Sequence, residues 1–105
     1  MSKKNGRLEM LERLTGGGSE DPFAWYGLAL EYRASGRVED ALRTFARLRE
    51  IDAVYLPAYL MAGQLLLDED RPEEAREWLE AGVALATERG DAKTRSELET
   101  ALALC

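Results

Sequence analysis

Residues 25–48 read WYGLALEYRASGRVEDALRTFARL, and residues 59–82 read YLMAGQLLLDEDRPEEAREWLEAG. When the chain is shifted by 34 residues, the distance from Trp25 to Tyr59, the two stretches coincide in their apolar, small and polar positions. The aligned pairs are Trp25 with Tyr59, Leu28 with Ala62, Ala29 with Gly63, Tyr32 with Leu66, Ala41 with Ala75, Phe45 with Leu79, and Leu48 with Gly82. A fixed period of this length is the signature of a repeat protein, in which each repeat is one unit of packed secondary structure.

The spacing inside each copy predicts two helices joined by a short turn. Apolar or small residues recur at i, i+3, i+4 and i+7, and then at i, i+4 and i+7 beyond a polar turn, so each set lies on one helix face. Gly36 lies in the turn, where glycine can adopt the left-handed conformation that closes a helix. Asp21-Pro22 predicts a helix start, with the aspartate as N-cap and proline at the first helical position, and Pro72 marks a start in the same way. Close approach of the paired helices is predicted from small residues at Ala29, Ala41, Gly63 and Ala75.

These motifs resemble the tetratricopeptide repeat, whose pattern has an aromatic residue, then Leu-Gly, then Tyr, and later Ala and Phe. The first copy is Trp25-x-x-Leu28-Ala29-x-x-Tyr32 followed by Ala41-x-x-x-Phe45, with alanine in place of glycine. The second is the looser Tyr59-x-x-Ala62-Gly63-x-x-Leu66 followed by Ala75-x-x-x-Leu79, and both copies lack the late proline of the family. The resemblance covers residues 22–89 and implies an all-α superhelix, or solenoid, of antiparallel helix pairs. Arginine outnumbers lysine by 11 to 3, which favours a bacterial source.

The resemblance also predicts how the chain is organised. We expect about six helices in a single domain at residues 7–105, preceded by a disordered basic tail at residues 1–6. A helix at 7–14 would be the second half of an incomplete repeat, in which Leu11 and Leu14 align with the packing residues Phe45 and Leu48. Full repeats are expected at 22–55 and 56–89, and a capping helix with one solvated face at 92–104.

Composition narrows the classes of partner. The 105 residues are enough for one domain, and 14 basic against 20 acidic residues give a net charge of −6. An acidic surface repels phosphate groups, so we expect neither nucleic acid nor an anionic membrane as a partner. The sequence contains no apolar stretch of the roughly 20 residues that a membrane span needs and no apolar signal peptide, so we expect a cytoplasmic chain. The only cysteine is Cys105, which is interpreted as a small apolar residue on the last helical turn.

Catalytic chemistry has little support in the residue inventory. The chain has no histidine, which excludes histidine-based acid–base catalysis, triads and histidine metal sites within it. Asp68-Glu69-Asp70 lacks the glycine and the ligand spacing of a calcium loop and is interpreted as a solvated turn. Gly16-Gly17-Gly18 lacks the lysine of a phosphate-binding loop and is interpreted as a linker. We therefore expect no enzymatic activity, no cofactor and no metal.

The resemblance implies that the first helix of each pair lines a concave surface. The residues of these helices that are not assigned to packing within the pair form a mainly apolar stripe: Phe23, Tyr26, Leu30 and Arg33, with Pro57, Leu60, Gln64 and Leu67 as counterparts. Exposed apolar stripes usually mark interfaces. The partner-binding residues are expected to be Phe23, Tyr26, Leu30, Arg33, Leu60, Gln64 and Leu67, unless the flanking helices fold over the stripe and bury it. A clamp for a chaperone C-terminal carboxylate is not expected, because the matching positions hold Tyr26, Leu30 and Met61 instead of Lys and Asn.

Two functions remain open at this stage. The first is an adaptor or scaffold that binds a partner protein or peptide on the concave apolar surface. The alternative is a self-associating structural protein that forms a dimer or larger assembly through the apolar stripe or its end helices.

Overall fold

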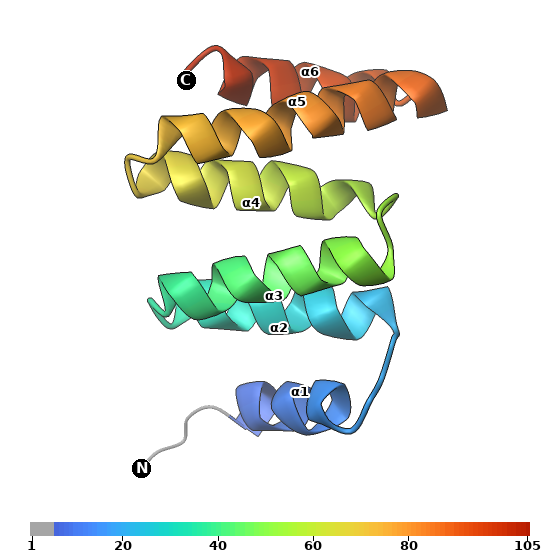
Figure 1. The fold of residues 1–105 in the computed structure, drawn as a ribbon, viewed down its shortest axis with the longest axis vertical. Helices are drawn as coiled ribbons and strands as arrows, with labels where there is room; N and C mark the ends of the chain where they lie inside the picture. The colour runs from blue at the N-terminus through green and yellow to red at the C-terminus, as the bar shows by residue number, and fades with distance from the viewer. Residues whose placement is uncertain (1–5) are drawn as a thin grey trace. The chain divides into compact units, whose positions relative to one another are not determined.

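The computed structural model describes residues 6–105, so residues 1–5 of the expected basic tail lie outside the described residues. The described chain contains six helices and no strand (Figure 1). They are α1 (Gly6–Gly16), α2 (Pro22–Ala34), α3 (Val38–Ile51), α4 (Leu56–Asp68), α5 (Pro72–Arg89) and α6 (Ala92–Leu102). This confirms the all-α fold class. Across residues 6–105, no helix has both the length and the apolar character needed to cross a membrane.

The helices form two compact units that divide after Ala53. In the first unit α2 packs against both α1 and α3, and in the second unit α5 packs against both α4 and α6. Each unit therefore contains one of the two repeated helix pairs, α2–α3 or α4–α5, together with one additional helix. The single domain at residues 7–105 stays a prediction.

The helix starts expected from the sequence are confirmed at two aspartates. The Asp21 carboxylate accepts a hydrogen bond from the Phe23 backbone N–H at 3.0 Å, and Pro22 is the first residue of α2. The Asp91 carboxylate caps α6 in the same way, accepting from the Thr94 N–H at 3.0 Å. Each cap satisfies a backbone donor that the helix itself leaves unpaired, and thereby fixes where the helix begins.

The turn inside each helix pair has the same backbone geometry in both copies. Gly36 has a φ of 76°, and its counterpart Asp70, 34 residues later, has a φ of 59°. Aspartate is one of the few side chains that tolerate this left-handed region. Equivalent backbone hydrogen bonds of 2.9 Å run from Arg37 N–H to the Tyr32 carbonyl and from Arg71 N–H to the Leu66 carbonyl. The 34-residue repeat seen in the sequence therefore holds at the level of single backbone bonds.

In the first unit, one residue that the sequence pattern predicts to be buried is exposed. Leu11 is buried as expected, but Leu14 is 49% exposed. The α1 helix packs chiefly against α2, and the stripe that it buries is formed by Leu8, Leu11 and Thr15. The Thr15 hydroxyl tolerates this position because it donates to the Leu11 carbonyl at 2.9 Å. Leu14 lies beside this narrow stripe and stays in contact with solvent.

In the second unit, glycines allow the helices to approach closely. A Cβ atom built on Gly63 would lie 2.4 Å from Leu79 Cδ2, and one built on Gly82 would lie 2.8 Å from Leu98 Cδ2 and 2.9 Å from Tyr59 Cβ. Leu79 and Leu98 are fully buried, so their side chains have little room to move aside. The predicted role of Gly63 in close helix packing is confirmed, and Gly82 has the same role between α5 and α6.

A hydrogen bond joins α1 to α2 at the edge of the first unit. The Tyr32 hydroxyl donates to the Glu12 carboxylate at 2.6 Å, and the Arg37 guanidinium lies over the Tyr32 ring at 4.6 Å from its centre. Burial, and then the hydrogen bond and negative charge of Glu12, raise the pKa of Tyr32 from 10.0 to about 12. The folded protein therefore retains the Tyr32 proton at a pH where the unfolded chain loses it.

The first prediction concerns the close helix approach at Gly82. Overpacking a core costs about 1–3 kcal/mol, and replacing a helical glycine by alanine returns about 1 kcal/mol. The net cost lies between about 0 and 2 kcal/mol, and we expect Gly82→Ala to lower the free energy of unfolding by about 1 kcal/mol in urea denaturation. Gly27→Ala is the control, because its Cβ would meet Leu11 Cδ1 at an ordinary 3.5 Å. That variant should be as stable as the wild type or more stable, and a stabilising Gly82→Ala would contradict the packing argument.

The second prediction concerns pH and the Tyr32–Glu12 bond. Because the pKa of Tyr32 is raised to about 12 on folding, its contribution to stability is complete below pH 10 and is lost as the pH rises towards 12. We expect the free energy of unfolding of the wild type to fall more steeply between pH 10 and 12 than that of Tyr32→Phe. Urea denaturation at several pH values measures both curves, and parallel curves would show that Tyr32 titrates normally.

Candidate functional site

The first half of the apolar stripe lies on α2. Phe23 is 68% exposed, whereas Tyr26, Leu30 and Arg33 are half-buried. The Tyr26 ring lies 6.5 Å from the ring of the buried Phe45 on α3, tilted by 60°. Tyr26 therefore also packs inside the helix pair, a role that the sequence pattern did not assign to it. The face that it leaves uncovered is smaller than expected.

The second half of the stripe lies on α4, where part of it borders a cavity. Leu60, Gln64 and Leu67 are half-buried, and Pro57 is exposed. Pro57 and Leu60 line a cavity of about 380 Å³ that Gln64 and Leu67 do not reach. Its remaining lining residues are Leu56, Arg89, Asp91, Thr94 and Glu97. We call this space the α4–α6 cavity; its floor is apolar and its rim, formed by the start of α6 and the residues before it, is polar.

A second apolar feature lies on α1 and the start of α2. Met10 is 44% exposed, Leu14 49% and Phe23 68%, and all three border a cavity of about 200 Å³. These three residues are called the N-terminal apolar patch. The sequence pattern predicts Phe23 as part of the stripe, does not single out Met10, and predicts that Leu14 is packed in the core. Because residues 7–14 are predicted to be the second half of an incomplete repeat, the sequence does indicate that one face of α1 lacks a helix partner.

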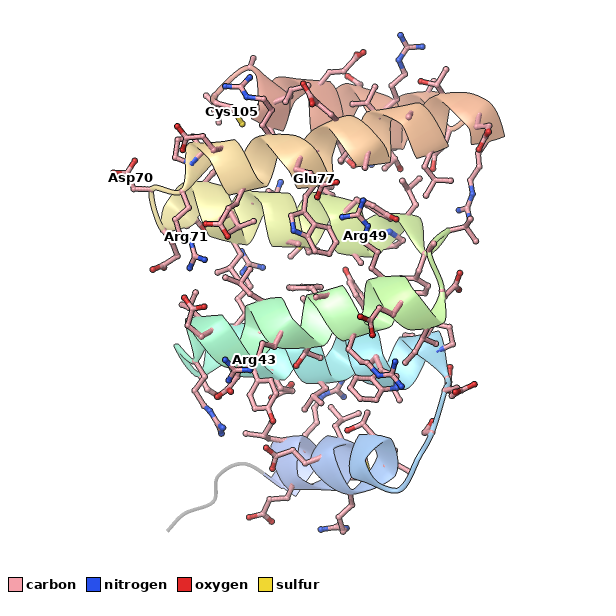
Figure 2. The ribbon with its side chains drawn as sticks, viewed as in Figure 1. Arg43, Arg49, Asp70, Arg71, Glu77 and Cys105 are labelled. Atoms are coloured by element: carbon pink, nitrogen blue, oxygen red, sulfur yellow. The ribbon has the colours of Figure 1, made fainter. Side chains whose placement is uncertain are left out.

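The first unit also contains a larger space, the α1–α3 cleft, with a volume of about 410 Å³. Its floor is formed by Trp25, Leu28 and Tyr32 of α2, and one wall by Glu12, Thr15 and Gly16 of α1. The other wall is formed by Asp40, Arg43, Thr44 and Arg47 of α3. Arg43 lies on the α1 side of α3 (Figure 2). The sequence analysis assigned Trp25 to packing and gave Arg43 and Arg47 no role, because exposed charges on a helix carry no periodic signal.

Electrostatic contacts hold the side chains of this cleft in place. The Trp25 indole N–H donates to the Ser19 carbonyl at 2.8 Å, and the Arg47 guanidinium lies 5.8 Å from the Trp25 ring centre. The Asp40 carboxylate binds both Arg37, at 2.8 Å, and Arg43. The Arg37 hydrogen bond is the main cause of a pKa of Asp40 below its usual value, so this carboxylate is ionised at neutral pH.

The described residues offer no constellation for metal binding. Between Gly6 and Cys105, no group of three or more His, Cys, Asp or Glu side chains is placed so that it could hold a metal ion. Asp70 and Arg71 lie in the turn between α4 and α5, and the Arg71 guanidinium pairs with Glu74 at 2.7 Å (Figure 2). The acidic segment at residues 68–70 thus contributes a turn between two helices.

Comparison with known proteins agrees with the helix pairs and turns described above. The family model described as tetratricopeptide repeat matches residues 32–102. No curated protein matches the chain. Among solved structures, a tetratricopeptide repeat domain protein from Salinibacter ruber is 36% identical, with a TM-score of 0.73 over 79% of this chain and 84% of its own.

Two further structures show the same fold at lower identity. A protein from Bordetella parapertussis is 25% identical, with a TM-score of 0.79 over 94% of this chain and 86% of its own. The type III secretion translocator chaperone SycD of Yersinia enterocolitica has a TM-score of 0.83 over 92% of this chain and 68% of its own, and is 17% identical. With a family model that matches residues 32–102 and a solved relative that is 36% identical over most of its length, the chain belongs to the tetratricopeptide repeat family.

Proposed function

We propose that this chain is a non-enzymatic adaptor that binds a partner protein or peptide through the apolar residues of its first helices. Family membership supports a protein-interaction module, and SycD, which shares the fold, is a chaperone of translocator proteins. The proposed binding residues are those of the stripe on α2 and α4. We also propose a cytoplasmic location.

The α4–α6 cavity is the observation that carries this proposal. Its floor is made of Leu56, Pro57 and Leu60, of which the exposed Pro57 and the half-buried Leu60 belong to the stripe. A volume of about 380 Å³ lies within the range of ligand pockets. Apolar floors with polar rims are typical of sites that take one apolar side chain of a partner as an anchor.

The rim of this cavity is already tied into the fold. Asp91 caps α6 through the Thr94 N–H, and the resulting hydrogen bond lowers the pKa of Asp91. Lys93 pairs with Glu97 at 3.3 Å, and the Arg89 guanidinium donates to the Val54 carbonyl. The Asp91 cap and the Arg89 bond hold part of the rim in place before a partner arrives, whereas the exposed Lys93–Glu97 pair adds little. A pre-formed opening reduces the ordering that binding requires.

The third prediction tests the apolar floor. Leu60→Glu would place a carboxylate at a site built for an apolar side chain, so we expect binding of the partner to weaken by at least about tenfold. Wild type, Leu30→Glu/Leu60→Glu and a control variant are used as baits in a lysate of the organism that encodes the chain. Leu104→Glu is the control, because Leu104 is 74% exposed and borders none of the three described cavities.

Captured proteins are compared by mass spectrometry, and circular dichroism checks that each bait is helical. A partner of the stripe is retained by the wild type and Leu104→Glu and lost with Leu30→Glu/Leu60→Glu. If all three baits retain the same proteins, the stripe is not the binding surface.

The N-terminal apolar patch supports a second candidate function, self-association. Met10, Leu14 and Phe23 are exposed beside one another on α1 and the start of α2. Arg7 and Asp21, which have opposite charges, border the same cavity. A two-fold contact brings the same patch of two copies together, so apolar residues flanked by both charges can complement themselves.

The fourth prediction tests this candidate by sedimentation velocity. Wild-type protein is measured at two concentrations about a hundredfold apart, and a self-associating chain sediments faster at the higher one. We expect Met10→Glu/Leu14→Glu to remain a monomer at both concentrations, because the new carboxylates would face one another across a two-fold contact. Leu104→Glu serves again as the control and should behave as the wild type. A wild type that is monomeric at both concentrations would rule out strong self-association.

A further inference from the structure

The α1–α3 cleft combines an aromatic floor with cationic side chains on one wall. Trp25, Leu28 and Tyr32 of α2 form the floor. Arg43 and Arg47 are one helical turn apart on α3, and both border the cleft. Their side chains are exposed by 71% and 50%, so both guanidinium groups are accessible from solvent. A volume of about 410 Å³ is sufficient for an aromatic side chain of a partner.

The acidic groups of the cleft are already engaged. The Glu12 carboxylate on the α1 wall accepts the Tyr32 hydroxyl hydrogen bond at 2.6 Å. Asp40 on the α3 wall is shared between Arg37 and Arg43, so one carboxylate faces two guanidinium groups. The remaining lining residues of the α1 wall, Thr15 and Gly16, carry no charge.

Arg47 is the cation best placed to take a new partner. Its Nη1 contacts Glu50 Oε1 at 3.1 Å, but the two side chains are exposed by 50% and 69%. Ion pairs that are this exposed contribute little, so a ligand carboxylate can replace Glu50 at small cost. Arg47 also lies over the Trp25 ring. A guanidinium that stacks on a ring keeps the N–H donors at its edge available for a bidentate bond to a carboxylate.

These features are complementary to one kind of ligand. A carboxylate would bind the guanidinium groups of Arg43 and Arg47, and a neighbouring apolar side chain would lie on Trp25 and Leu28. The residues that line the cleft include two guanidinium groups, Arg43 and Arg47, and two carboxylates, Glu12 and Asp40, so the lining is neutral, whereas the chain has a net charge of −6. Because Glu12 and Asp40 already accept bonds from Tyr32 and Arg37, a ligand carboxylate would meet the donors of Arg47.

We propose that the α1–α3 cleft is a second docking site, which binds an extended acidic segment of a partner protein that carries an aromatic or aliphatic side chain between its carboxylates. This site is distinct from the stripe and the α4–α6 cavity, and it does not depend on the function proposed for them. It requires that the partner supply negative charge, whereas the floor of the α4–α6 cavity requires only an apolar anchor.

The two tryptophans of the chain provide a direct test by NMR. Trp25 lines the cleft and its indole N–H donates to the Ser19 carbonyl, whereas Trp78 lies in the second unit with its ring 5.6 Å from that of Tyr59. The probe is the peptide acetyl-Asp-Phe-Asp-Leu-Glu-amide, added to ¹⁵N-labelled protein. We expect the Trp25 indole signal to move with peptide concentration until it saturates, while the Trp78 signal stays in place.

Two comparisons assign the binding to charge and to the arginines. A peptide with Asn and Gln in place of Asp and Glu should bind at least about tenfold more weakly, because it lacks the charge-assisted bonds. Arg43→Gln/Arg47→Gln should weaken binding of the acidic peptide by a similar factor. Arg95→Gln is the matched control, since Arg95 is an exposed arginine paired with Glu99 on α6, and it should bind as the wild type does.

Several results would overturn the proposal. These are a Trp25 signal that does not move at millimolar peptide, equal binding of the acidic and neutral peptides, or full binding by Arg43→Gln/Arg47→Gln. The oligonucleotide dT6 is titrated in parallel, and binding of dT6 alone would make the cleft a nucleic-acid site and refute the peptide proposal. Leu60→Glu is titrated as well and should bind the peptide normally, which separates this site from the stripe.

Discussion

The fold depends on the contact between a small residue on one helix and a large, fully buried residue on the next. Gly63 receives Leu79 where α4 meets α5, and Gly82 receives Leu98 where α5 meets α6. At these points there is no room for one additional carbon atom, so the helix separation is set by the absence of a side chain. Close contact of this kind gains dispersion energy from many atom pairs at once. It also restricts the sequence more strongly than a general requirement for apolar residues.

The turn inside each helix pair has a constant geometry, and this makes the packing contacts recur at a fixed interval along the chain. In both copies the turn has a left-handed residue, Gly36 or Asp70, and an arginine that pairs with an acidic residue three positions later. A turn of constant geometry returns the chain at the same point, so Gly63 faces Leu79 in the second copy, and the first copy has the fully buried Ala29 and Phe45 at the equivalent positions. The 34-residue period follows from helix length and turn geometry together, and a change in either would misplace the contact.

The 34-residue period also decides which parts of the structure can be predicted from the sequence. The helix pairs, the caps at Asp21 and Asp91 and the glycine contact at Gly63 are predictable because they recur with the period or depend on one local bond. The exposure of Leu14 is not predictable, because it results from α1 having one main helix neighbour. The alignment of α1 with the second helix of a repeat assumes that the repeat is complete. The α1–α3 cleft is not predictable either. Three helices contribute to it, and its arginines are exposed side chains whose positions follow no period.

The packing rule also explains how one small chain can carry surfaces of different chemistry. Positions that pack inside a pair are fixed as small or apolar, but the outward positions of α3 and α6 are free to take any charge. At the α4–α6 cavity this freedom is used at Glu97 of α6, whereas Asp91 at the same rim is held as the cap of α6. At the α1–α3 cleft the outward positions of α3 hold Arg43 and Arg47, beside the aromatic residues of the floor. Because these charges make no contribution to helix separation, they can change without loss of the fold, and the partners that each surface selects can diverge independently.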